Sequence, residues 1–203
     1  MVEKKAENIL WHHSHINRSD RERLNKHRGI TLWFTGLPAS GKSTIAVELE
    51  KALHQRNCHT YILDGDNIRH GLNKDLGFSP EDRTENIRRI GEVANLLREC
   101  GLINMVAFIS PYRSDRKTAR DLSKNDGTFF EVFIDCPVNV CESRDPKGMY
   151  QKAREGIIKE FTGISAPYEP PENPEIHLRT NEYGIDSCVQ IILNFLIEKN
   201  YIF

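Results

Sequence analysis

The sequence has 203 residues, enough for one domain with a sizeable core. Lysine and arginine number 28 and aspartate and glutamate 29, so the formal net charge is −1, which argues against a general nucleic-acid or membrane surface. No apolar run is long enough to span a bilayer, and no apolar stretch follows the first residues as in a secretory signal. The five cysteines form no C-x-x-C pair, which favours reduced thiols in the cytoplasm.

Residues 1–28 are predicted to form an N-terminal arm or a short surface helix ahead of a single domain, residues 29–203. The arm carries His12, His13 and His15, which could bind a metal. No carboxylate or cysteine partner stands at ligand spacing, so a surface arm is the favoured interpretation. The apolar residues around Trp11 indicate that the arm packs against something.

Beyond residue 28, β-prone apolar runs alternate with helical patterns. The predicted strands are 30–35, 60–63, 102–109, 129–134 and 176–179. One predicted helix follows the glycine loop at 36–43, and another starts at Ser79-Pro80 and ends near Gly101. Three more predicted helices cover 114–122, 138–144 and 186–199. Residues 145–174, rich in proline and charge, are predicted to be an irregular lid. This alternation predicts an α/β fold, with a parallel sheet covered on both faces.

The segment Gly36–Ser43 fits the pattern G-x-x-x-x-G-K-[ST] in full, and it lies between a predicted strand and a predicted helix. Its backbone N–H groups and the helix N-terminus favour an anion. Lys42 is expected to reach the β- and γ-phosphates of ATP, and Ser43 to ligate Mg²⁺. The predicted ATP-binding residues are Gly36, Leu37, Pro38, Ala39, Ser40, Gly41, Lys42, Ser43 and Thr44. The loop alone does not separate a kinase from a GTPase, but an Asn-Lys-x-Asp guanine signature is missing from the sequence.

The stretch after the second predicted strand carries candidate acceptor-side chemistry. Asp64 and Asp66 follow the carboxyl end of that strand, where α/β sheets place ligands. Two acids near a phosphate loop can hold Mg²⁺ or accept a hydroxyl proton. Arg69 can bind phosphate or sulfate. A turn with solvated charges is the alternative, and for Asp66 the position after a strand favours function.

Two further segments contribute candidates from the pattern alone. Arg83 and Asn86 share one face of the helix that starts at Ser79, although a surface salt bridge would be the default interpretation of Arg83. Ser110 stands at the end of the third predicted strand, where many P-loop proteins carry a Mg²⁺-organising aspartate. This moves the expected metal and base functions to Asp64 and Asp66, and the candidate metal ligands are Ser43, Asp64 and Asp66.

Five segments in this order resemble the adenylyl-sulfate kinase (APS kinase) family: 36–43, 64–69, 76–83, 108–113 and 159–164. The resemblance runs from about residue 8 to the C-terminus. It implies a three-layer P-loop kinase fold with a five-stranded parallel sheet, ATP as a substrate, Mg²⁺ as a cofactor, a homodimer, and a cytoplasmic place in sulfate assimilation. It also implies transfer of the ATP γ-phosphoryl group to the 3′-hydroxyl of adenosine 5′-phosphosulfate (APS), which gives ADP and 3′-phosphoadenosine 5′-phosphosulfate (PAPS).

By the same resemblance, eleven residues line the APS pocket: Asp66, Asn67, Arg69, Phe78, Arg83, Asn86, Ile109, Ser110, Lys147, Glu160 and Phe161. Phe78 and Phe161 could sandwich the adenine, with stacking of about 1–3 kcal/mol per base, although either could be plain core. Lys147 could close over phosphates and exclude water.

The candidate catalytic residues are Asp66, Lys42 and Ser110. The family is commonly described as using a phosphoserine at the position of Ser110. In-line transfer needs only positioning, charge neutralisation and a base, so the role of Ser110 stays open.

Two other functions fit parts of the sequence. One is a different P-loop kinase, acting on gluconate, shikimate or a nucleoside phosphate, but the paired aromatic residues and paired arginines favour an adenine-bearing, doubly anionic acceptor. The other is a nucleotide-binding regulatory module without turnover. The presence of Lys42, Ser43 and Asp66 argues against that alternative.

Overall fold

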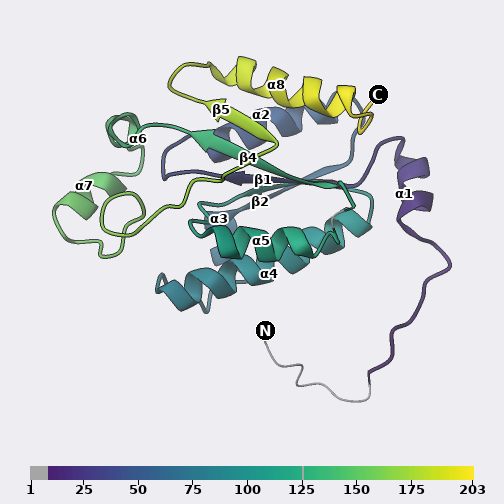
Figure 1. Ribbon diagram of the computed structural model, residues 1–203, viewed down its shortest axis with the longest axis horizontal. Helices are drawn as coiled ribbons and strands as arrows, with labels where there is room; N and C mark the ends of the chain where they lie inside the picture. The colour runs from purple at the N-terminus through teal and green to yellow at the C-terminus, as the bar shows by residue number, and fades with distance from the viewer. Residues whose placement is uncertain (1–8, 125) are drawn as a thin grey trace.

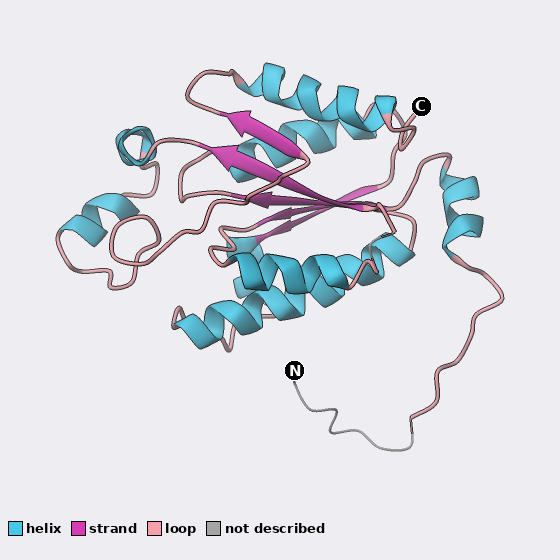
Figure 2. Cartoon of the chain, viewed as in Figure 1, coloured by secondary structure: helices cyan, strands magenta, loops and turns pink. Residues whose placement is uncertain are grey.

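The computed structural model describes residues 9–124 and 126–203, and over this part of the chain a five-stranded parallel sheet lies between two layers of helices (Figures 1 and 2). The sheet has the order β2-β3-β1-β4-β5. Its strands are β1 (Ile30–Thr35), β2 (Thr60–Asp64), β3 (Ile103–Ala107), β4 (Phe129–Asp135) and β5 (Ile176–Arg179). One face is covered by α2 (Lys42–His54) and α8 (Ile185–Glu198), the other by α4 (Pro80–Glu99) and α5 (Arg113–Asp121). The predicted α/β fold class is confirmed.

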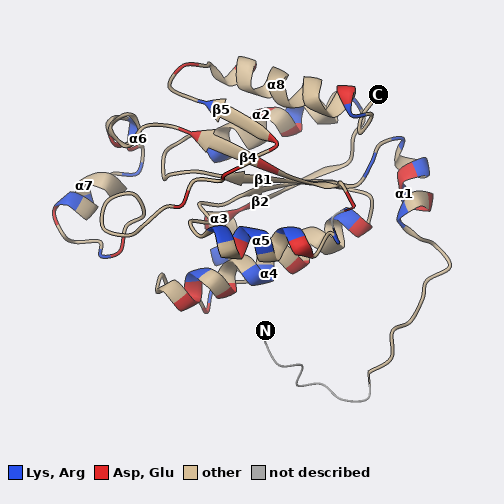
Figure 3. Ribbon diagram, viewed as in Figure 1, with Lys and Arg blue, Asp and Glu red and all other residues tan. Residues whose placement is uncertain are grey.

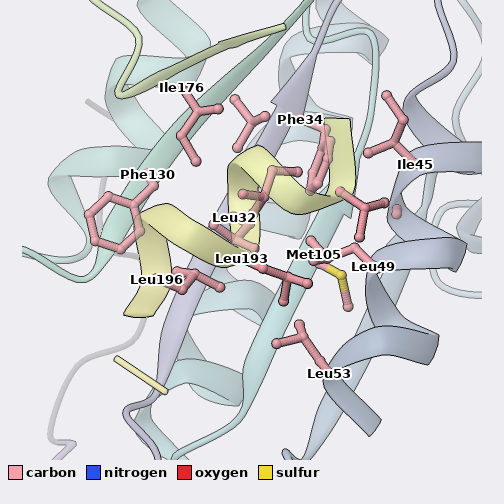
Figure 4. Packing of buried hydrophobic residues seen from close by; sticks show 14 of the residues in the cluster. Leu32, Phe34, Ile45, Leu49, Leu53, Met105, Phe130, Ile176, Leu193 and Leu196 are labelled. Carbon is pink, nitrogen blue, oxygen red and sulfur yellow. The ribbon is translucent and has the colours of Figure 1, made fainter. Parts of the chain in front are cut away.

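The central strand β1 is anchored from both faces. All six of its residues are buried, as expected for a parallel strand between two helical layers. Leu32 and Phe34 pack in the cluster that α2 and α8 complete (Figure 4), whereas Trp33 packs on the other face with Ile90 of α4. This double burial fixes the point at which the chain leaves Thr35 and enters the glycine loop.

The helix α4 begins as its sequence predicts. The Ser79 hydroxyl accepts the backbone N–H of Asp82 at 3.1 Å, and Pro80 occupies the first turn. Along the surfaces of α1 (Arg18–Asn25), α4 and α5, residues of both charge signs lie side by side (Figure 3). Among the helices of the described residues, none combines the length and the apolar character that crossing a membrane requires.

The lid is more ordered than the prediction of an irregular segment. After α6 (Val138–Arg144), residues 145–174 contain the helix α7 (Met149–Arg154). The Asp145 carboxylate accepts the backbone N–H groups of Met149 at 2.8 Å and Tyr150 at 3.0 Å, so one acid starts this helix. Beneath the lid, Tyr150 and Phe161 belong to a third apolar cluster and meet edge to face. The sequence did not indicate α7, which this capping and burial stabilise, and the described residues of the lid outside α7 form no further helix or named strand.

The N-terminal arm contains the helix α1, and residues 1–8 of the arm lie outside the described residues. Arg18 attaches α1 to the domain through an ion pair with Asp126 at 2.7 Å. Trp11 is 84% exposed, so the prediction that it packs is wrong for a single chain. In the part of the chain that the structure describes, no three His, Cys, Asp or Glu side chains gather as a metal site, and this includes the three arm histidines.

Candidate active site

A cavity of about 860 Å³ opens at the carboxyl edge of the sheet, lined by the segments that follow β1, β2, β3 and β5 and by the lid. This is where parallel α/β sheets place their ligands. Most of the predicted site residues line it together: Pro38, Ala39, Ser40, Gly41, Lys42, Ser43, Thr44, Asp64, Asp66, Arg69, Phe78, Arg83, Asn86, Ile109, Ser110, Lys147, Glu160 and Phe161. Of the predicted residues, all of which are described, Gly36, Leu37 and Asn67 are not part of this lining.

The glycine loop has the backbone that an anion site needs. Gly36 and Gly41 have φ values of +155° and +107°, which side-chain-bearing residues rarely adopt. A Cβ on Gly36 would also stand 2.4 Å from the carbonyl oxygen of Ile134. Gly41 precedes α2 and, among the described residues, no side chain caps it, so the first N–H groups of the helix face the loop.

Lys42 is held inside the loop. Its Nζ donates to the carbonyl oxygens of Gly36 at 3.0 Å and Leu37 at 2.8 Å. Burial lowers the pKa of Lys42 to about 8. A phosphate at the loop would stabilise the charged form, so the geometry provides a cation whose interaction is strongest with an anionic ligand.

Ser43 and Asp64 form the candidate Mg²⁺ position. The Ser43 hydroxyl donates to Asp64 Oδ2 at 2.6 Å. The other Asp64 oxygen accepts the backbone N–H of Asp66 at 3.0 Å and so caps α3 (Gly65–Arg69), a short helix that the sequence did not indicate. A hydroxyl and a carboxylate beside a phosphate loop are hard oxygen donors, which fit Mg²⁺ shared with substrate phosphates.

Asp66 lies two residues further along, in the first turn of α3, and is not part of this pair. Its carboxylate forms an ion pair with Lys147 of the lid, and both side chains are about two-thirds exposed. The hydrogen bond to Asp66 raises the pKa of Lys147. The lid thus contacts the segment after β2 through a solvent-accessible ion pair, in which another anion can readily replace Asp66 as the partner of Lys147.

On the acceptor side, the side chains of two arginines, Arg69 and Arg83, donate hydrogen bonds to backbone carbonyl oxygens. Arg69 donates to the carbonyl oxygens of Leu76 and Gly77, each at 2.9 Å, and its guanidinium lies 4.4 Å from the ring centroid of Phe78. Phe78 is 62% exposed and Phe161 only 7%, so the two predicted adenine-stacking rings present very different areas to the cavity.

Arg83 connects the acceptor side to the lid. Its Nε donates to the carbonyl oxygen of Phe78 at 2.9 Å, and its terminal nitrogens donate to the carbonyl of Glu160 at 2.7 Å and the hydroxyl of Thr162 at 2.9 Å. Arg83 therefore joins α4 to the lid by hydrogen bonds, whereas its helix position alone suggested a surface salt bridge. Nearby, the buried Asn86 accepts a hydrogen bond from Asn73 at 2.8 Å.

Ser110 is buried at 2% exposure and has a φ of +41°. Its Oγ accepts the indole N–H of Trp33 at 3.1 Å and lies 3.5 Å from the carbonyl oxygen of Phe108. A hydroxyl with these partners is oriented by the protein core.

Sequence reasoning missed a group that supports the loop from outside. Arg144 donates to both the carbonyl of Thr180 at 2.6 Å and the carbonyl of Ser40 at 3.4 Å, and the Thr180 hydroxyl donates to Ser40 at 2.8 Å. The Tyr150 hydroxyl donates to the carbonyl of Pro38 at 3.0 Å. One available signal was the position of Thr180, directly after the last predicted strand.

Comparisons with known proteins agree on one family. The sequence model of the family described as adenylylsulphate kinase matches residues 28–179. An adenylyl-sulfate kinase from Staphylococcus haemolyticus (strain JCSC1435) is 57% identical over 197 residues, 97% of this chain and 98% of that protein. One from Saccharomyces cerevisiae (strain ATCC 204508 / S288c) is 57% identical over 198 residues, again 97% and 98%. Among solved structures, a Mycobacterium tuberculosis APS kinase in complex with AMPPNP and APS is 50% identical with a TM-score of 0.80, covering 84% of this chain and 98% of that chain.

Proposed function

The chain belongs to the adenylyl-sulfate kinase family, and we propose that its cavity transfers the γ-phosphoryl group of ATP to the 3′-hydroxyl of APS, giving ADP and PAPS. The observation that carries this proposal is that the glycine loop, Asp66, Phe78 and Arg83 all line one cavity of about 860 Å³. The relative from M. tuberculosis, whose structure is in complex with AMPPNP and APS, supports the same pairing of ligands.

The donor half of the reaction uses the loop. The N–H groups before α2 and the Lys42 ammonium bind the β- and γ-phosphates and stabilise the charge that develops as the bridging oxygen leaves. Ser43 and Asp64 would hold Mg²⁺, which when bound supplies further neutralisation of phosphate charge.

The acceptor half uses Asp66 and the lid. Phosphate oxygens compete with Asp66 for Lys147, and this exchange leaves the Asp66 carboxylate available to accept the proton of the attacking hydroxyl. Phe78 offers its exposed ring to the adenine, and Arg69 and Arg83 provide positive charge for the phosphosulfate. The lid that Arg83 holds through Glu160 keeps water from the γ-phosphate.

A coupled ADP-release assay tests the function with APS, gluconate, shikimate and a nucleoside monophosphate as acceptors. We expect turnover with APS alone. Turnover with another acceptor and none with APS would replace the proposal with a different P-loop kinase. ATP binding without transfer to any of the four would favour a regulatory module.

The substitution Ser110→Ala is expected to keep measurable kinase activity. The Ser110 hydroxyl is held by Trp33 in the core, and direct in-line transfer does not require it as a nucleophile. We expect a reduction of about tenfold or less in kcat, from the loss of one orienting hydrogen bond. Steady-state kinetics with ATP and APS provide the measurement. An inactive variant that still binds both nucleotides would support a phosphoserine route instead.

Family membership also supports a cytoplasmic homodimer that works in sulfate assimilation. All five cysteines, which lie within the described residues, carry free thiols, as suits a reducing compartment.

A further inference from the structure

Arg116 of α5 is a buried cation whose three bonds lead to three different parts of the fold. It is 3% exposed. Its Nε donates to the Glu131 carboxylate of β4 at 2.5 Å, which neutralises its charge. One terminal nitrogen donates to the carbonyl oxygen of Ser110 and the other to that of Glu169, both at 2.7 Å. A planar guanidinium can span two such acceptors, which a lysine ammonium cannot do in the same geometry.

The first of these carbonyls belongs to the edge of the cavity. Ser110 has a φ of +41°, a conformation that residues with a side chain adopt at a cost. The preceding carbonyl, that of Ile109, accepts the Thr35 hydroxyl at 2.7 Å. Arg116 and Thr35 therefore fix adjacent carbonyls of the segment that lines the acceptor side, and Thr35 stands directly before the glycine loop.

The second carbonyl belongs to the C-terminal end of the lid. There the Glu169 backbone N–H donates to the carbonyl of Pro111 at 2.9 Å, and the Glu169 carboxylate accepts the N–H of Arg113 at 2.8 Å. The Arg113 side chain donates to the carbonyl of Pro170 at 2.7 Å. The Tyr168 hydroxyl lies 3.0 Å from that of Thr35. This end of the lid is thus fastened to the start of α5.

The other end of the lid is attached differently. Arg144 ties it to the carbonyls of Ser40 and Thr180, on the ATP side of the cavity. Between the two ends, the lid meets the cavity through the exposed Lys147–Asp66 pair and through Arg83. Arg116 therefore anchors both the C-terminal end of the lid and the Ser110 segment that lines the acceptor side of the cavity.

We propose that Arg116 is a positioning residue for the acceptor, which holds the Ser110 segment and the C-terminal end of the lid in a fixed relation. The inference rests on the proposed kinase function. Loss of the two hydrogen bonds from Arg116 to the carbonyls should disturb the placement of APS and the exclusion of water. ATP binding should change little, because the contacts of Arg144, Thr180 and Tyr150 with the glycine loop remain.

The test compares Arg116→Lys with Arg120→Lys. A lysine at 116 keeps the charge opposite Glu131 and loses the fork across the two carbonyls. Arg120 lies on the same helix, and its described contacts are with Glu131, Glu175 and the carbonyl of Phe129, not with Ser110 or Glu169. It is the matched control for the loss of a guanidinium from α5.

For Arg116→Lys we expect kcat/KM for APS to fall by about 10- to 100-fold, since a displacement near 1 Å can reduce the rate by that much. The KM for ATP should stay within about twofold, and ATP hydrolysis without transfer should rise relative to PAPS formation because the lid excludes water less well. Arg120→Lys should keep the wild-type values of all three. Equal kinetic changes in the two variants, or an unchanged kcat/KM for APS in Arg116→Lys, would overturn the proposal.

Arg113→Ala gives a second test that does not depend on the core. Its side chain is about half exposed, so the variant should fold, and it loses the bond to Pro170. We expect the ratio of hydrolysis to transfer to rise in the same direction as in Arg116→Lys. If Arg116→Lys does not fold, an unchanged ratio in Arg113→Ala refutes the lid part of the proposal. Absence of APS turnover in the wild-type enzyme would instead refute the kinase function itself.

Discussion

The substitution Lys42→Ala is expected to abolish turnover, with a loss of at least about 10³-fold in kcat, because charge stabilisation is the main catalytic contribution in phosphoryl transfer. The fold should survive this change. Burial lowers the pKa of Lys42 to about 8 from 10.5, so the folded state carries a poorly solvated charge below pH 8. That destabilisation is complete below pH 8 and disappears as the pH rises from 8 to 10.5. At pH 7 the variant should therefore unfold at a Tm no lower than that of the wild type.

The matched control is Lys51→Ala, on the same helix. Lys51 is largely exposed and pairs with Glu48 at 3.6 Å, so its removal should change neither kcat nor Tm appreciably. Steady-state kinetics and thermal unfolding at pH 7 measure both effects. Near-wild-type turnover in Lys42→Ala would show that the loop lysine does not have the role given to it here. A large fall in Tm would mean that the lost activity reports unfolding.

The second large effect is expected for Asp66→Ala and its isosteric counterpart Asp66→Asn. A positioned general base contributes about 10²- to 10⁴-fold, and both variants should lose kcat in that range while the KM for ATP changes little. Since the Asp66 side chain is about two-thirds exposed, neither variant should lose stability. Asn keeps the shape of the side chain and removes the base, so equal losses in the two variants would identify charge as the property that matters.

Asp75→Ala is the control for Asp66. It removes an exposed carboxylate from the same region, where Asp75 pairs with Arg89 at 2.7 Å. Its kinetic constants should match the wild type. If Asp66→Asn turned over APS at a near-normal rate, another group would have to accept the proton, and Asp64 would be the nearest candidate along the chain.

The strands and the glycine loop could be predicted from the sequence because their signals are local. A strand such as Ile30–Thr35, buried on both faces, is a continuous apolar run, and the loop pattern specifies its own backbone. By contrast, α3 and α7 each begin because one aspartate, Asp64 or Asp145, accepts backbone N–H groups. Such caps are common residues in turns as well, so their presence does not predict a helix.

Long-range contacts account for the rest. The position of Thr180 after the last strand places it at the ligand edge of the sheet, but nothing in the local pattern indicates that Thr180 and Arg144 both meet Ser40, since the three come from distant segments. Phe161 illustrates the same limit. Its place in a family motif predicted a stacking ring, and its burial to 7% exposure comes from the whole apolar cluster beneath the lid, in which it meets Tyr150 edge to face.

The position of β1 in the sheet has a consequence for how this chain is made. Both neighbours of β1 come from much later in the sequence, β3 at Ile103–Ala107 and β4 at Phe129–Asp135. At a synthesis rate of about 5–20 residues per second, β1 leaves the ribosome seconds before either partner. Closing such long loops costs entropy before strand pairing compensates for it. The nascent apolar strand therefore waits unpaired, and ATP can stabilise the chain only after the lid and the segment that follows β5 have completed the site.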